Sequence, residues 1–144
     1  MRTAEDDIKT IPMERREAVA YAADLETIRI NRWRVFETWK RKIGNLDTTS
    51  ENLDTGRLSP GWIYVITNIT AIEEGTKPTT IRIGYVRSGH FNRLTIQTPT
   101  NNNDSVDYVG QVILREGDII RAQFCGATAS DTIYLYVNGY KIRR

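Results

Sequence analysis

Apolar residues recur with a helical spacing in the first third of the chain. From Pro12 to Ile43 they return every three, four or seven positions, which places side chains on one face of an α-helix: Ala18, Ala22, Leu25, Ile28, Val35, Trp39 and Ile43. Thr10 suits the N-cap, Pro12 suits the first turn, and Gly44 is a good C-terminal stop. The pattern predicts one helix over residues 12–43, about 48 Å long and longer than the domain that the remaining residues could form.

Residues 45–60 end this pattern, and after them the period changes from helical to two. The stretch is polar and contains Gly56 and Pro60, which is typical of a linker. Alternating residues then predict strands at 62–69, 80–86, 91–97, 106–114, 118–124, 131–138 and 140–142. We therefore expect a helical arm at 1–44, a linker at 45–57 and a β-domain at 58–144 that folds on its own.

Short turn sequences separate the predicted strands. Ser88-Gly89-His90 predicts a tight connection, Arg115-Glu116-Gly117 a short hairpin turn and Asn138-Gly139 a two-residue hairpin. Six to eight short strands without an intervening helix indicate an antiparallel sandwich or barrel. The predicted fold class is all-β, a jelly-roll-like antiparallel β-sandwich preceded by a long helix. An immunoglobulin-like sandwich and a five-stranded barrel are the alternatives.

Aromatic residues thicken the apolar stripe near the end of the predicted helix, at Trp33, Phe36 and Trp39. They could pack on the protein's own β-domain or on another chain, and each arrangement could hold for a different part of the helix. Because the stripe is longer than one small domain can cover, we expect part of it to lie in an interface. The candidate interface residues are Leu25, Ile28, Val35, Phe36 and Trp39.

Charge is distributed unevenly along the same segment. Residues 1–28 carry four basic and seven acidic side chains, whereas residues 29–45 carry six basic side chains and one acidic one. Cations at the end of a helix favour its macrodipole, and a basic patch for nucleic acid or an acidic partner is the alternative interpretation. The net charge of the whole chain is only +2, too small to predict a nucleic-acid-binding protein.

The sequence contains little that could carry catalysis. One histidine, His90, and one cysteine, Cys125, exclude paired-histidine sites, thiolate clusters and intrachain disulfides. Phosphate-binding loops and hydrolase or metalloprotease motifs are absent. The loop 101–104, with Asp107 nearby, offers oxygen atoms but lacks the spacing of a calcium loop. We expect no enzymatic activity, no cofactor and no metal.

Two tyrosines, Tyr134 and Tyr136, alternate with apolar residues and share one face of a predicted strand. Tyrosines on a sheet face can stack on sugars or bases, or anchor a protein interface. These two side chains therefore form a candidate ligand face, which Arg82, Arg93 and Arg121 could line if their strands are neighbours.

Two long segments carry a resemblance to a known class of protein. They are PGWIYVITNITAIEEG and VILREGDIIRAQFCGATASDTIYLYVNGY, which resemble the strands and hairpins of jelly-roll modules in bacteriophage virion proteins. Such modules occur in capsid decoration (cement) proteins, head fibres and neck or tail adaptors, and the resemblance covers residues 58–142.

The resemblance implies a non-catalytic structural subunit of a virus particle, made in the host cytoplasm and located in the virion. Its N-terminal helix would anchor it to capsid, portal or tail subunits, as a homo-oligomer or part of a symmetric assembly. No membrane partner is expected, because no apolar run reaches the roughly 18–20 residues of a membrane helix. A carbohydrate- or receptor-binding module and a single-strand nucleic-acid binder are the alternatives.

Overall fold

The computed structural model describes residues 33–144, and this part of the chain is all-β. Its secondary structure consists of strands joined by turns and loops. The strands are β1 (Trp33–Ile43), β2 (Ser50–Asp54), β3 (Trp62–Glu74), β4 (Thr80–Arg87), β5 (His90–Gln97), β6 (Ser105–Leu114), β7 (Ile119–Cys125) and β8 (Thr132–Arg143).

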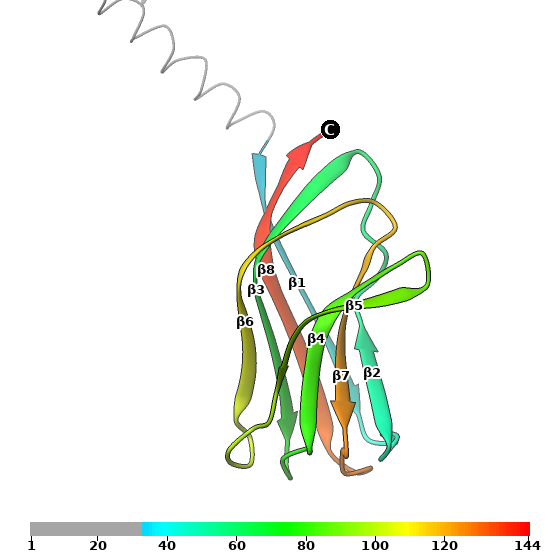
Figure 1. The fold of residues 1–144 in the computed structure, drawn as a ribbon, viewed down its shortest axis with the longest axis vertical. Helices are drawn as coiled ribbons and strands as arrows, with labels where there is room; N and C mark the ends of the chain where they lie inside the picture. The colour runs from blue at the N-terminus through cyan, green and yellow to red at the C-terminus, as the bar shows by residue number, and fades with distance from the viewer. Residues whose placement is uncertain (1–32) are drawn as a thin grey trace, which may run out of the picture. The chain divides into compact units, whose positions relative to one another are not determined.

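The strands form two layered sheets of four, in the orders β1-β8-β3-β6 and β2-β7-β4-β5 (Figure 1). Antiparallel pairing joins β2 to β7, β3 to β6 and β4 to β5, so the chain folds back on itself like a long hairpin wrapped around a core. Most strands that follow one another in sequence lie in opposite sheets, as in a jelly roll. The predicted all-β antiparallel sandwich is confirmed for the described residues.

One apolar core fills the space between the sheets. Alternate residues of each strand point inward, and β-branched side chains dominate because they pack well on a pleated surface. Its largest fully buried apolar side chains are Tyr64, Ile66, Ile69, Ile81, Ile83, Val106, Leu114, Ile120, Phe124, Ile133 and Leu135.

The helix predicted up to residue 43 is wrong over residues 33–43, which form strand β1. Val35, Trp39 and Ile43 are four residues apart, and four is a multiple of the strand period, so all three lie on one face of a strand. Phe36 falls on the other face and packs edge-on against Tyr64, with 4.9 Å between ring centroids. Such aromatic and β-branched residues favour strands. The rest of the predicted helix, residues 12–32, lies outside the described residues.

The predicted linker is also wrong, because residues 50–54 form β2. Glu51 and Leu53 alternate with exposed or half-buried neighbours and are buried, as are Leu46 and Leu58 on either side of the strand. Val35–Arg144 therefore makes up one compact unit, and the predicted boundary at residue 58 falls inside it.

The turns differ in how well the sequence predicted them. Ser88 and Gly89 have φ angles of 54° and 74° and join β4 to β5 as a two-residue hairpin, as predicted. The turn at 115–117 exists but links two sheets, since β6 pairs with β3 and β7 pairs with β2 and β4.

The hairpin predicted at Asn138-Gly139 does not form, because β8 runs straight through these residues. Gly139 lies opposite Ile66, next to an irregularity in the β3–β8 register. A Cβ atom at this position would lie 2.1 Å from the carbonyl oxygen of Val65. The glycine is thus required for close backbone approach within a sheet, and its sequence signal resembles that of a turn.

Candidate functional site

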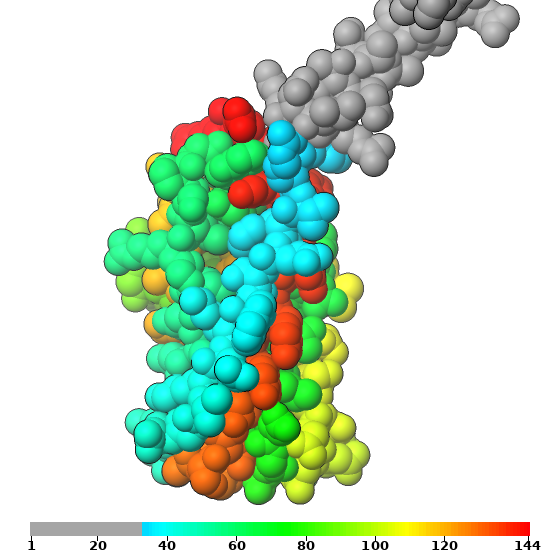
Figure 2. All heavy atoms as spheres, turned by 180° about the vertical axis from the view of Figure 1, so that it is seen from behind, coloured from blue at the N-terminus to red at the C-terminus, as the bar shows by residue number. Residues whose placement is uncertain are grey.

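The solvent-facing side of the sheet β1-β8-β3-β6, called the outer face below, is unusually apolar. Between Val35 and Arg144, eight large hydrophobic side chains are exposed, and seven of them lie on this face: Val35, Trp39, Ile43, Ile63, Val109, Ile113 and Tyr136. The eighth, Ile96, lies on β5 of the other sheet. Figure 2 shows the outer face, with β1 in blue to cyan beside β8 in orange to red, and β3 in green and β6 in yellow beyond.

Aliphatic side chains occupy two of the strands on this face. Val109 and Ile113 on β6 are 76% and 65% exposed, and Ile63 on β3 is 37% exposed. Ile113 lies opposite Val65 on β3, which in turn lies opposite Tyr140 on β8, so one transverse row crosses three strands. We call Ile63, Val109 and Ile113 the aliphatic patch.

Aromatic side chains form a second group on the outer face, the aromatic row of Trp39, Tyr136 and Tyr134. The rings of Trp39 and Tyr136 are stacked with 6.4 Å between centroids, and those of Tyr136 and Tyr134 with 6.0 Å. Both tyrosines of the predicted ligand face thus lie where alternation along β8 places them. Trp39 joins them because β1 is a strand next to β8.

An open cleft of about 520 Å³ lies beside the aromatic row, lined by Ile72, Glu74, Asn103, Tyr134 and Tyr136. The Tyr134 hydroxyl donates a 2.9 Å hydrogen bond to Glu74, which raises the pKa of the phenol. Asn103 accepts a 2.8 Å hydrogen bond from the Gly75 amide through its side-chain oxygen. These bonds fix the polar groups at the rim of an otherwise apolar and aromatic surface.

The three arginines predicted to line the tyrosine face do not do so, because their strands belong to the other sheet. Arg121 on β7 binds Asp54 through two hydrogen bonds of 2.7 and 2.9 Å. Arg82 on β4 donates to Gln123 at 3.1 Å, and Arg93 lies on β5. Strand order, which composition does not reveal, separates the cations from the tyrosines.

The candidate interface residues divide into three groups. Val35 and Trp39 lie exposed on the outer face, at 78% and 56%. Phe36 points inward against Tyr64. Leu25 and Ile28 lie outside the described residues.

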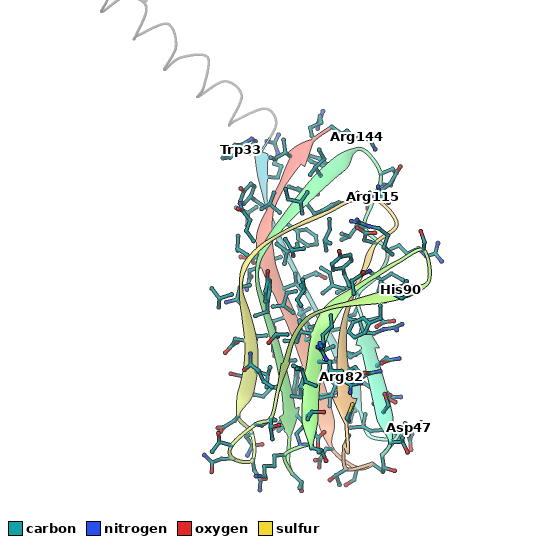
Figure 3. All side chains as sticks on the ribbon, in the orientation of Figure 1. Trp33, Asp47, Arg82, His90, Arg115 and Arg144 are labelled. Atoms are coloured by element: carbon teal, nitrogen blue, oxygen red, sulfur yellow. The ribbon has the colours of Figure 1, made fainter. Side chains whose placement is uncertain are left out.

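Other candidate chemistry is sparse in residues 33–144. His90 is exposed at the start of β5, on the projecting β4–β5 hairpin (Figure 3). Cys125 is a half-buried free thiol at the end of β7. Within this range no group of three or more His, Cys, Asp or Glu side chains is placed to hold a metal ion. The same residues include no helix of the length and apolarity needed to span a membrane.

One buried carboxyl group, Glu73 on β3, is the strongest electrostatic anomaly of the described chain. Its side chain is 1% exposed, and one of its oxygens, Oε1, has no hydrogen-bond partner. Burial, followed by its contact with the Asp131 carboxyl, raises the pKa of Glu73 to about 7, although the Thr128 amide donates to Oε2 at 3.3 Å. Glu73 therefore keeps its proton in the folded protein at pH values where it ionises in the unfolded chain.

We expect Glu73→Gln to stabilise the protein at pH 8 by about 3 kcal/mol and to change little at pH 4. The ordinary pKa of a glutamate is 4.5, and folding raises that of Glu73 to about 7. The stability that the protonated Glu73 contributes is therefore fully present below pH 4.5 and is lost as the pH rises to about 7. Gln mimics the protonated acid and has no charge to desolvate. Urea denaturation at both pH values measures the difference, with the exposed neighbour Glu74→Gln as control. Equal loss of stability with pH in wild type and Glu73→Gln would contradict it.

Comparison with known proteins found no matching family model and no matching curated protein. Similar solved structures include a CBM4 carbohydrate-binding module, at 12% identity over 77% of this chain and 94% of that one, with a TM-score of 0.37. They also include the virus-like particle of the extra small virus of the prawn Macrobrachium rosenbergii, at 11% identity over 76% and 79%, with a TM-score of 0.37. A third is TmCBM61 in complex with β-1,4-galactotriose, at 15% identity over 83% and 94%, with a TM-score of 0.23.

Proposed function

We propose that this protein is a non-catalytic structural subunit of a virus particle, of the bacteriophage decoration or neck and tail adaptor type, and that it joins neighbouring subunits through its outer face. One observation carries the proposal. Seven of the eight exposed large hydrophobic side chains between Val35 and Arg144 lie on this single face.

The physical reason lies in how antiparallel sheets meet water. A sheet with one face on the core normally presents polar residues on the other, so that the two sides alternate cleanly. Here the outer positions of β6 carry Val109 and Ile113 at 76% and 65% exposure, where polar residues would cost nothing. Contiguous exposed apolar surface on a soluble domain marks an interaction site.

The phage assignment is supported by the jelly-roll strand order together with the resemblance of residues 58–142 to virion modules. A subunit of this kind works by buried area and geometry, and it needs no catalytic group. Its partners would be capsid, portal or tail proteins, or further copies of the same chain.

The double substitution Val109→Asp and Ile113→Asp should abolish assembly and leave the fold intact. Two carboxylates buried without partners in an interface cost several kcal/mol, enough to reduce incorporation at least about a hundredfold. Both wild-type side chains are mostly exposed, so thermal melting should change little. Co-sedimentation with assembled particles, and light scattering for molar mass, measure the loss.

Ile96→Asp is the matched control, because Ile96 is 40% exposed on the other sheet. It should incorporate like wild type. If the β6 variant incorporates equally well, or if the control fails to the same degree, the outer face is not the assembly surface.

A further inference from the structure

We propose that the cleft beside the aromatic row binds a neutral saccharide chain, with a sugar ring lying on Ile72 and against Tyr134 and Tyr136 while its hydroxyls bond to Glu74 and Asn103. This goes beyond the assembly role: the cleft shares Tyr136 with the apolar residues of the outer face, but it contains no residue of the aliphatic patch. The two activities can be tested independently.

The size and lining of the cleft fit a small ligand. Its volume of about 520 Å³ lies within the range of roughly 300–1,000 Å³ typical of ligand pockets. Ile72 lies directly opposite Tyr134 in the β3–β8 register, so an apolar floor meets an aromatic wall. Sugar rings have one apolar C–H surface and a rim of hydroxyls, and they pair in this way with tyrosine rings.

The polar groups offer both kinds of hydrogen bond. Glu74 is exposed and presents carboxylate acceptors, one of which already receives the Tyr134 hydroxyl at 2.9 Å. Because the Asn103 side-chain oxygen accepts from Gly75, its NH₂ group is turned to donate elsewhere. A ligand with many hydroxyls can give a hydrogen to Glu74 and receive one from Asn103.

The charges select a neutral ligand. Two carboxylates lie on this part of the outer face, Glu74 in the cleft and Asp107 on β6, where Asp107 accepts a 2.5 Å bond from Thr70. They oppose phosphates and uronic acids. Arg41 on β1 lies 5.9 Å from the ring of Trp39, and its charge reaches the Tyr134 hydroxyl, where it offsets part of the rise in pKa that Glu74 causes, so it opposes cationic ligands. A polyhydroxyl compound without charge meets neither repulsion.

The aromatic row favours a chain over a single sugar. Trp39, Tyr136 and Tyr134 are spaced 6.4 and 6.0 Å apart across two strands, and Trp39 and Tyr136 are 56% and 41% exposed. When one sugar ring is bound in the cleft, the next sugar units of the same chain would therefore reach Tyr136 and Trp39. Longer oligosaccharides should bind more tightly than the corresponding disaccharides.

The test uses the full chain and an array of neutral pyranose oligosaccharides, followed by calorimetry with the hexasaccharide that gives the strongest signal. We expect Tyr134→Ala and Tyr136→Ala each to weaken its binding at least tenfold. Tyr134→Phe keeps the ring and should lose less. Val109→Ala, on the same face outside the cleft, should bind like wild type. A uronic-acid hexasaccharide should bind at least tenfold more weakly than the neutral one.

Several results would overturn the proposal. They are the absence of binding to every neutral oligosaccharide, unchanged affinity in both alanine variants, or tyrosine-dependent binding of an oligonucleotide instead. Should an alanine variant fail to melt cooperatively, Glu74→Gln and Asn103→Ala test the rim in its place, and unchanged affinity in both would again overturn it. Val109→Asp with Ile113→Asp should keep glycan binding while losing assembly, which separates failure here from failure of the structural role.

Discussion

A fragment that begins at Leu58 should not fold, whereas one that begins at Trp33 should. The shorter fragment lacks β1 and β2, which form an edge of each sheet beside β8 and β7. It also lacks Leu46 and Leu53, which are buried at 4% and 6% exposure. Exposed core and two newly unpaired strands leave a small sandwich without enough buried surface to offset the entropy of folding.

Circular dichroism and thermal melting of the two fragments check this expectation. The fragment 33–144 should give a β spectrum and a cooperative melt, and the fragment 58–144 the spectrum of an unfolded chain. A cooperative transition in 58–144 would mean that β3 to β8 suffice for the fold.

Asp118→Ala should reduce the free energy of unfolding by about 3 kcal/mol. Asp118 is 2% exposed and receives two hydrogen bonds from Arg87, at 3.0 and 2.7 Å, and one from the Arg115 amide at 2.9 Å. The substitution leaves these donors without their acceptor. Since Arg87 is 31% exposed, water replaces part of the loss, which keeps the figure at the low end for a broken buried pair.

The pH dependence gives a second check on this pair. Burial by itself raises the pKa of Asp118, but the hydrogen bonds from Arg87 and Arg115 outweigh it and hold the pKa below its ordinary value. Its contribution is therefore present above about pH 4 and is lost as the pH falls through the folded-state pKa. Urea denaturation should show the cost of Asp118→Ala shrinking below pH 4.

Glu116→Ala is the control, because it removes an exposed ion pair between Glu116 and Arg144, whose charged atoms lie 3.9 Å apart. It should lower the free energy of unfolding by under about 0.5 kcal/mol. A comparable cost for both variants would contradict the assignment.

Alternation predicted the strands from Trp62 onward because both sheets have one face on the core. The predicted strands lie close to β3 through β8. Alternation does not predict which strands pair, above all where the partners are distant along the chain. The pattern at Asn138-Gly139 predicts a turn, because a glycine needed for close backbone approach and a glycine needed for positive φ look alike in sequence.

The region before residue 58 was predicted less well, for two physical reasons. Val35, Trp39 and Ile43 are four residues apart, a spacing that fits one face of a helix and also one face of a strand. What distinguishes the two is that Phe36, next to Val35, points to the opposite side, into the core. The short strand β2 carries Glu51 at a buried position, where the sequence shows a charge. Its ion pair with Lys42 of β1, nine residues earlier and in the other sheet, neutralises that charge, and the hydrophobic pattern gives no signal for a pair between two sheets.

The candidate site was only partly visible in the sequence. Tyr134 and Tyr136 were identified by alternation alone, because strand period fixes which side chains share a face. Trp39, Glu74 and Asn103 come from three other parts of the chain and join them only through strand order. Glutamate and asparagine residues beside loops are common in any sequence, so the sequence alone contains no feature that would select Glu74 and Asn103.

The placement of β1 at a sheet edge gives its cations a meaning different from a helix end. Lys40, Arg41 and Lys42 follow one another on a strand whose outer backbone edge has no partner strand within the described residues. The same strand carries Val35, Phe36 and Trp39, a composition prone to stack into fibrils. Lys42 pairs with Glu51 of β2, so the like charges that would repel a second such edge are those of Lys40 and Arg41, which protect this sheet edge as gatekeeper residues. Protection of the sheet edge thus constrains the same strand that contributes apolar surface to the outer face.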